Sequence, residues 1–188
     1  MEESNDIVFS KNTVEFVTVA AEYCVYIEQS AGKTRKEFAG TLLKLLPLLY
    51  LKAQMLPEDE CVSDVPAEDF VNENDYEEVR ETVAAIMAER DDYLEVFVSD
   101  MKYSDTPIRK TISEDLADIY QDIKNFVSLF RTGLNSVMHD AVVECGENFS
   151  HYWGQTLVNT LRALHDVQYN SESEADDENN KEEEDEDI

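Results

Sequence analysis

The sequence is poor in residues that break regular structure and in residues that cross-link it. Five glycines and four prolines in 188 residues are too few for an all-β fold, which needs many tight turns. The three cysteines, Cys24, Cys61 and Cys145, are odd in number and far apart, which excludes a disulfide framework and a cysteine zinc site. These absences favour a helical protein that folds without disulfides or a structural metal.

Basic residues are also scarce, because 43 acids stand against 15 bases and the net charge is −28. A surface of this charge repels nucleic-acid phosphate and anionic lipid, so we expect neither nucleic acid nor a membrane as a partner. The acidic N-terminus does not resemble a signal peptide. The longest apolar stretch, residues 42–56, contains two lysines and is too short to span a bilayer. Together with the cysteine pattern, these features predict a cytoplasmic protein.

Apolar residues recur with helical period along most of the chain. They predict helices at about residues 13–29, from 34 through Pro47, 74–90, from a Ser113 cap to Gly133, and 135–167, the last being one long helix or two that meet near Gly146. We expect Pro47 to kink or divide the second helix. Apolar residues surround that helix almost completely, which predicts a central position in the fold. The helical pattern fails over residues 91–111, where residues 93–98 fit either a short strand or a frayed helix and residues 103–107 (YSDTP) predict a turn.

The predicted fold class is therefore all-α, an irregular antiparallel bundle of about five to six helices that forms one domain over residues 7–169. Residues 170–188 contain eleven acids, a single lysine and no recurring apolar residue. This composition predicts a disordered acidic C-terminal tail.

The known phosphate-binding and metal motifs are incomplete. Residues 32–34 (GKT) match the end of a P-loop, but Ile27 occupies the place of its first glycine, and the preceding segment has a helical pattern. We interpret this segment as a helix–helix turn with Thr34 as the N-cap. None of the three histidines follows a glutamate by three positions, which excludes the usual di-iron bundle motif. We expect no cofactor and no catalytic residue.

Helical carboxylates leave one enzymatic alternative open. Helical nucleotide pyrophosphohydrolases bind Mg²⁺ through E-x-x-E motifs, and Glu78 and Glu81 have this spacing. Asp115, Asp118 and Asp122 share one flank of the fourth predicted helix, where a solvated charged face is also expected. A Mg²⁺ site formed by these five carboxylates is the alternative to a solvated surface.

Two stretches contain no acid, residues 38–57 and 148–165. Burial of leucines explains the first. In the second, a sector opposite the apolar stripe contains the polar residues Asn148, His151, Gln155, Asn159, Arg162 and Asp166. Either another segment covers this sector, residues 91–111 being the first candidate, or it is an interaction face formed by His151, Gln155, Asn159 and Arg162. In the covered case we expect Arg162 to be buried against a carboxylate.

Four segments resemble a known family: residues 45–53 (LLPLLYLKA), 112–122 (ISEDLADIYQD), 152–155 (YWGQ) and 161–165 (LRALH). The family is domain of unknown function 5063, a group of uncharacterised bacterial proteins found chiefly in Bacteroidetes, and the similarity covers roughly residues 7–169. The resemblance implies a bacterial origin and no activity. We predict a non-enzymatic helical interaction or regulatory module with a protein as the expected partner. A Mg²⁺-dependent nucleotide hydrolase is the alternative, and the sequence sets no oligomeric state.

Overall fold

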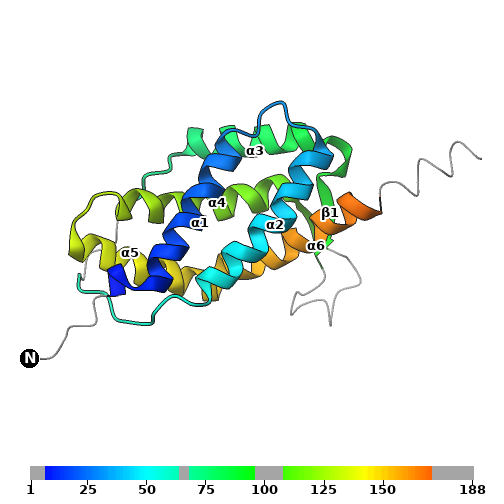
Figure 1. The fold of residues 1–188 in the computed structure, drawn as a ribbon. Coiled ribbons are helices and arrows are strands. Elements are labelled where there is room, and N and C mark those ends of the chain that lie inside the picture. Colours follow the sequence, from blue (N-terminus) through cyan, green and yellow to red (C-terminus); the bar gives the residue numbers. More distant parts are fainter. Residues whose placement is uncertain (1–6, 64–67, 96–107, 171–188) are drawn as a thin grey trace, which may run out of the picture.

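A computed structural model of the protein describes residues 7–63, 68–95 and 108–170. Within these residues the chain forms six α-helices and one two-stranded sheet (Figure 1). The elements in chain order are η1 (Ile7–Phe9), α1 (Lys11–Glu28), α2 (Arg35–Ala53), α3 (Glu73–Met87), η2 (Ala88–Arg90), β1 (Asp92–Glu95), β2 (Ile108–Thr111), α4 (Ile112–Phe130), α5 (Asn135–Asn148), η4 (Phe149–Trp153) and α6 (Gly154–Tyr169). The predicted helical bundle is confirmed, whereas the acidic tail lies outside the described residues from 171 onward.

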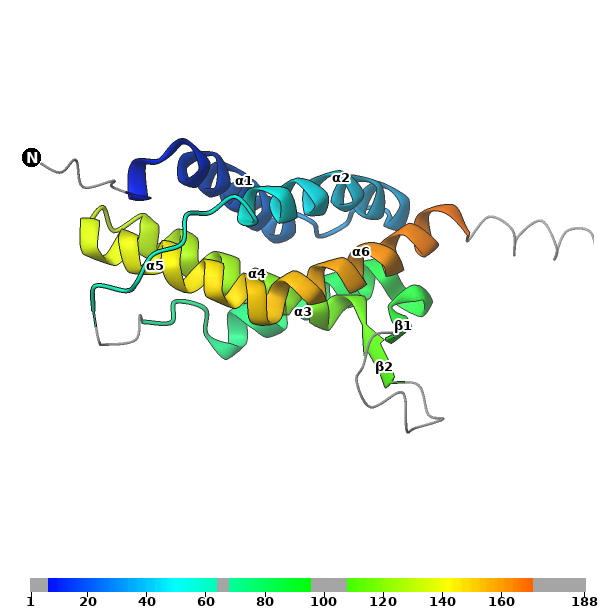
Figure 2. The same ribbon diagram turned by 90° about the horizontal axis from the view of Figure 1, so that it is seen from below.

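The helices form two layers. α1 and α2 lie side by side in an outer layer, which crosses a second layer made of α3, α4 and the continuous α5–α6 segment (Figures 1 and 2). α4 is the central helix, because it packs against α1, α3, α5 and α6 and buries eleven of its residues. α2 buries six, so the prediction that the second helix is central was wrong.

α2 also continues unbroken through Pro47, where the sequence predicted a kink or a division. Proline removes one N–H from the helix and frees the carbonyl one turn earlier. Because Pro47 lies on the exposed side of α2, water can satisfy that carbonyl. The helix therefore passes through the proline without ending.

Side-chain caps set where the helices begin. The predicted cap Thr34 is confirmed, since its hydroxyl accepts a hydrogen bond from the Glu37 N–H at 3.3 Å. α4 is capped by Thr111 and not by Ser113 as predicted. Ser113 is buried two positions after the cap, where its hydroxyl donates to the Asp91 carboxylate at 2.6 Å. Capping-box spacing favours Thr111, because Glu114 follows it by three positions, whereas Leu116 stands three positions after Ser113.

The last two helices join through a π-helical turn, η4. The Gly154 N–H donates to the Phe149 carbonyl, five residues earlier. A Cβ at Gly154 would lie only 2.4 Å from that oxygen, so the widened turn requires glycine there. The chain is helical without a break from α5 through η4 to α6, and the π-helical turn begins three residues after Gly146, where the junction was predicted.

Residues 91–111 begin and end as strands. β1 and β2 are antiparallel, and their register pairs Tyr93 with Lys110 and Glu95 with Ile108. The Ile112 N–H donates to the Asp91 carbonyl at 2.9 Å, which ties the sheet to the start of α4. Of the two predictions for this segment, the short strand is confirmed. The turn predicted for residues 103–107 lies outside the described residues.

None of the helices in these three described ranges combines the length and hydrophobicity needed to cross a bilayer.

Candidate functional site

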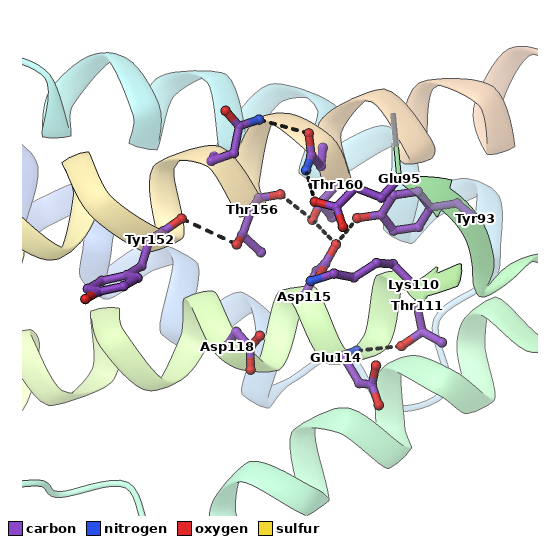
Figure 3. Close-up of polar contacts among 12 residues, drawn as sticks. Tyr93, Glu95, Lys110, Thr111, Glu114, Asp115, Asp118, Tyr152, Thr156 and Thr160 are labelled. Atoms are coloured by element: carbon purple, nitrogen blue, oxygen red, sulfur yellow. Dashed lines mark hydrogen bonds and ion pairs between the residues drawn. The ribbon is translucent and has the colours of Figure 1, made fainter. Parts of the chain in front are cut away.

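Asp115 is a buried carboxylate between α4, α6 and the two-stranded sheet (Figure 3). Its side chain is 1% exposed, which contradicts the expectation of a solvated position on the flank of α4. The Tyr93 hydroxyl donates to it, the Thr160 hydroxyl lies 3.2 Å from Oδ2, and Lys110 Nζ lies 3.8 Å from Oδ1. Three donors from three elements therefore converge on one carboxylate.

The strand register explains why Tyr93 and Lys110 meet the same carboxylate. The two residues stand directly opposite each other in the sheet, and such cross-strand partners point to the same face. Glu95 follows Tyr93 by two positions and shares that face. One face of the sheet thus presents a phenol, an ammonium group and a carboxylate to the helices.

Burial governs the electrostatics of this cluster. It raises the pKa of the Asp115 carboxyl, and the hydrogen bond from Tyr93 and the charge of Lys110 only partly oppose it. Burial, followed by the contact with Asp115, also raises the pKa of the Tyr93 phenol. The phenol therefore keeps its proton and remains a donor. With every side of Asp115 occupied, the cluster anchors the sheet to the bundle and leaves no space for a substrate at this carboxylate.

The acid-free stretch, residues 148–165, provides the donors for three carboxylates of other elements. Asn148 Nδ2 donates to Asp122 at 3.2 Å, Thr160 to Asp115, and Asn159 Nδ2 to Glu95 Oε1 at 3.2 Å. An acid at any of these donor positions would face a like charge, which is destabilising. The absence of acids on this side of the helix follows from packing.

The outer side of α6 and of the preceding η4 turn is exposed and is not covered by another described segment. His151, Gln155 and Arg162 are exposed, so the prediction that Arg162 is buried was wrong. Arg90 makes the ion pair instead, 3.2 Å from Asp166. Of the four candidate interaction residues, Asn159 alone is buried, between Glu95 and Gln155.

Two tyrosines extend this outer side at its ends. Tyr152 is 69% exposed and Tyr169 is 64% exposed. The His165 ring lies 4.7 Å from that of Tyr169. We call this set the α6 face: His151, Tyr152, Gln155, Val158, Arg162, His165 and Tyr169.

A groove runs beside the C-terminal half of the α6 face. It has a volume of about 660 Å³, and it is bounded by α6, η2 and the sheet. Arg162 and His165 line it on the helical side, and Tyr93 and Leu94 line it on the sheet side. Three acids, Glu89, Asp92 and Asp166, also line the groove, so it brings arginine, imidazole, carboxylate and aromatic side chains to one accessible surface.

The five carboxylates predicted to bind Mg²⁺ make separate contacts. Asp118 accepts a hydrogen bond from the Tyr76 hydroxyl at 2.8 Å, Glu81 lies 4.0 Å from Arg80, and Glu78 lines a small depression with Glu28 and Asp75. Asp115 and Asp122 point to their own donors, as described above. Across the described ranges, no group of three or more histidine, cysteine, aspartate or glutamate side chains has the geometry to hold a metal ion.

Asp122 has the clearest titration behaviour of the five. Burial raises the pKa of its carboxyl to about 6, against the hydrogen bond from Asn148, which lowers it. Nearby Asp118 and Asp69 raise the pKa further. Asp122 therefore takes up a proton in the folded protein at a pH where an ordinary aspartate is ionised.

Sequence reasoning missed Tyr93, Lys110 and Thr160 as partners of Asp115. The alternation of Tyr93 and Glu95 was visible, but their common face has meaning only once the strand pairing is known. Thr160 lies on the inner side of a helix, where a threonine can bond its own backbone. It does so here, since its hydroxyl also lies 2.8 Å from the Thr156 carbonyl.

An all-helical bundle with an anchored two-stranded sheet is the class that this geometry defines. A match to the family described as domain of unknown function (DUF5063) spans residues 7–170, and the chain belongs to this family. The chain is similar to protein BF1032 from Bacteroides fragilis, whose crystal structure was a structural-genomics target. The two share 53% sequence identity over 87% of this chain and 96% of that chain, with a TM-score of 0.78. The comparison with curated proteins returned no match.

Proposed function

We propose that the protein is a non-enzymatic cytoplasmic interaction module that binds a protein partner through the α6 face. The observation that carries this proposal is an exposed surface with two tyrosines, two histidines and an arginine, in a chain of net charge −28. Asp166 is the one acid between residues 148 and 169, and it is paired with Arg90. A face that only had to be solvated would carry acids, as most of this protein does. Exposed tyrosine and arginine are instead enriched in protein interfaces.

The chemistry of the α6 face defines the partner. Arg162 can bind a carboxylate through two parallel hydrogen bonds. Tyr152 and Val158 offer apolar area beside it, and both are exposed. The surrounding surface is acidic and repels a uniformly negative partner. The matching surface is therefore a protein patch with apolar side chains around one or two carboxylates.

The test is capture of partners from the native host by the tagged full-length protein and by the double variant Tyr152→Ala/Arg162→Ala. We expect the variant to lose the proteins that the wild type retains. The matched control is Phe9→Ala/Lys11→Ala, which removes an equally exposed aromatic ring and a cation from another part of the molecule. Equal capture by all three proteins would contradict the role of the α6 face.

A calorimetric titration with Mg²⁺ tests the enzymatic alternative. A one-to-one heat that disappears in Asp118→Ala would favour the Mg²⁺-dependent nucleotide hydrolase over the interaction module. We expect no such heat, because Asp115, Asp118 and Asp122 face different donors.

A further inference from the structure

The outward side of α2 is an apolar stripe that burial does not explain. Leu48 is 42% exposed, Leu51 is 51% exposed and Met55 is 41% exposed. At 100° per residue Leu48 and Leu51 lie about 60° apart, exposed Pro47 adjoins them, and Met55 lies in the turn just after the end of α2. Sequence analysis attributed the absence of acids in residues 38–57 to burial, and the exposure of this stripe shows that attribution to be incomplete.

The neighbouring helix enlarges this surface. α1 lies beside α2 in the outer layer (Figure 2), and the ion pair between Lys52 and Glu15 joins the two helices. Val14 and Val25 are exposed on α1. The outer layer thus presents apolar side chains from both helices. Leu48 and Leu51 are neighbours on one helix side and not isolated exposed residues, and such grouped apolar side chains are typical of contact surfaces.

The outer layer also differs in charge from the rest of the molecule. Residues 11–55 contain six bases and four acids and therefore have a net charge of +2. Since the whole chain has a net charge of −28, the rest of the chain has a net charge of −30. Three of those four acids are already in ion pairs, Glu15 with Lys52, Glu28 with Lys124 and Glu37 with Lys33. Two copies of this chain repel each other through their acidic surfaces, and this repulsion is weaker where the α1–α2 layer of one copy faces that of the other.

We propose that the α1–α2 layer is the contact surface of a homodimer. In a symmetric dimer the same patch meets itself across a two-fold axis. An axis near Leu51 places Leu48 of each copy opposite Met55 of the other, so the apolar stripe covers itself. Lys44, one turn before Leu48, then points toward the end of the partner's α2, where an acidic segment begins at Glu58. Apolar burial and charge both favour this arrangement.

The size of the layer sets the expected affinity. Helices of 18 and 19 residues are about 27 Å long, and two side by side span about 20 Å, a footprint of about 540 Å² per copy. This is smaller than the roughly 800 Å² per partner of a typical stable interface. A contact of this size is typical of weak, transient association, so we expect a Kd on the order of 10–100 µM.

The test is sedimentation equilibrium of the full-length protein across roughly 1 to 500 µM, a range that brackets this Kd. We expect the wild-type mass to rise from 21.6 kDa toward twice that value. Leu51→Glu places two like charges near the axis and should raise the Kd at least about tenfold. Since Leu51 is exposed, circular dichroism should show an unchanged fold. Raising the salt concentration should strengthen the dimer, because it screens the repulsion between two acidic bodies.

The matched control is Val158→Glu, which adds the same charge at an equally exposed position of the α6 face and should leave the dimer intact. A wild type that stays at 21.6 kDa at every concentration would overturn the proposal. So would equal dimerisation of Leu51→Glu, or masses that keep growing beyond two copies. Loss of the dimer in Val158→Glu but not in Leu51→Glu would assign self-association to the α6 face instead.

Discussion

The helices α2 and α6 pack against each other, and each contains a stretch without acids, yet the two stretches lack acids for different reasons. On α6, the inner polar residues donate hydrogen bonds to Asp115 and Glu95, and the outer residues are aromatic, basic or amide. On α2, the inner side is leucine packed in the core, and the outer side is apolar and exposed. A stretch without acidic residues indicates a surface where an acid would be unfavourable. The sequence does not show whether carboxylates of the same chain or contact with another molecule is the cause.

The largest expected effect on the free energy of unfolding is the difference between substitutions on the inner and outer sides of α2. Leu46 is fully buried on the inner side, so Leu46→Ala should lower the free energy of unfolding by about 3–4 kcal/mol through lost burial and a cavity. Leu48→Ala, on the exposed side, should change it by less than about 0.5 kcal/mol. Urea unfolding at low micromolar concentration, where the monomer dominates, measures both. Similar costs would mean that the outer side is covered within the monomer.

The next largest effect on the free energy of unfolding should come from Asp115, the buried carboxylate of α4 that contacts α6. Asp115→Ala leaves the Tyr93 hydroxyl and the Lys110 ammonium group without their acceptor, and we expect a loss of about 3 kcal/mol. Asp118→Ala is the control, since this exposed carboxylate has one hydrogen bond with Tyr76 and should cost less than about 1 kcal/mol. Denaturant titrations of the two variants compare them directly. If Asp118→Ala proved the costlier change, Asp115 would not anchor the sheet.

Asp122 should produce a smaller, pH-dependent effect. Its pKa is raised to about 6 in the folded protein, so its contribution to stability is present below the ordinary value near 4 and is lost as the pH rises through 6. Asp122→Asn removes the charge and keeps an acceptor for Asn148. For this half-buried group we expect a gain of roughly 1 kcal/mol at pH 7.5 that shrinks at pH 5. Thermal melts at both pH values test it, and a gain that grew at pH 5 would reverse the sign.

The smallest effect should be that of Arg162→Ala. The side chain is exposed, so the free energy of unfolding should change by less than about 0.5 kcal/mol, while capture of a partner should weaken. Paired measurement of thermal stability and of partner capture separates the two roles. A loss of several kcal/mol would restore the buried arginine that sequence analysis predicted, and would remove the α6 face from consideration as an interface.

Much of the fold was accessible from sequence, because helical periodicity and capping are local. The N-cap at Thr34 and the all-α class followed from residues a few positions apart, whereas the pattern near Tyr93 fitted a short strand and a frayed helix equally well. His151, Gln155 and Arg162 are exposed, as the proposed interaction face requires, and their role in binding a partner stays a prediction. Tyr152 and Tyr169 were missed because an aromatic residue on an apolar pattern is usually assigned to the core.

The sequence by itself determined that this chain forms amphipathic helices, where most of them begin, and that two stretches exclude acids. Only the tertiary structure decided which helix is central and which apolar side faces water. It also decided that Asp115 is buried, because that depends on the strand register that brings Tyr93 and Lys110 to one carboxylate. Periodicity is set by neighbours along the chain, whereas burial is set by whichever elements pack above a face. α2 is apolar almost all round, yet nothing in the described ranges lies over its outer side.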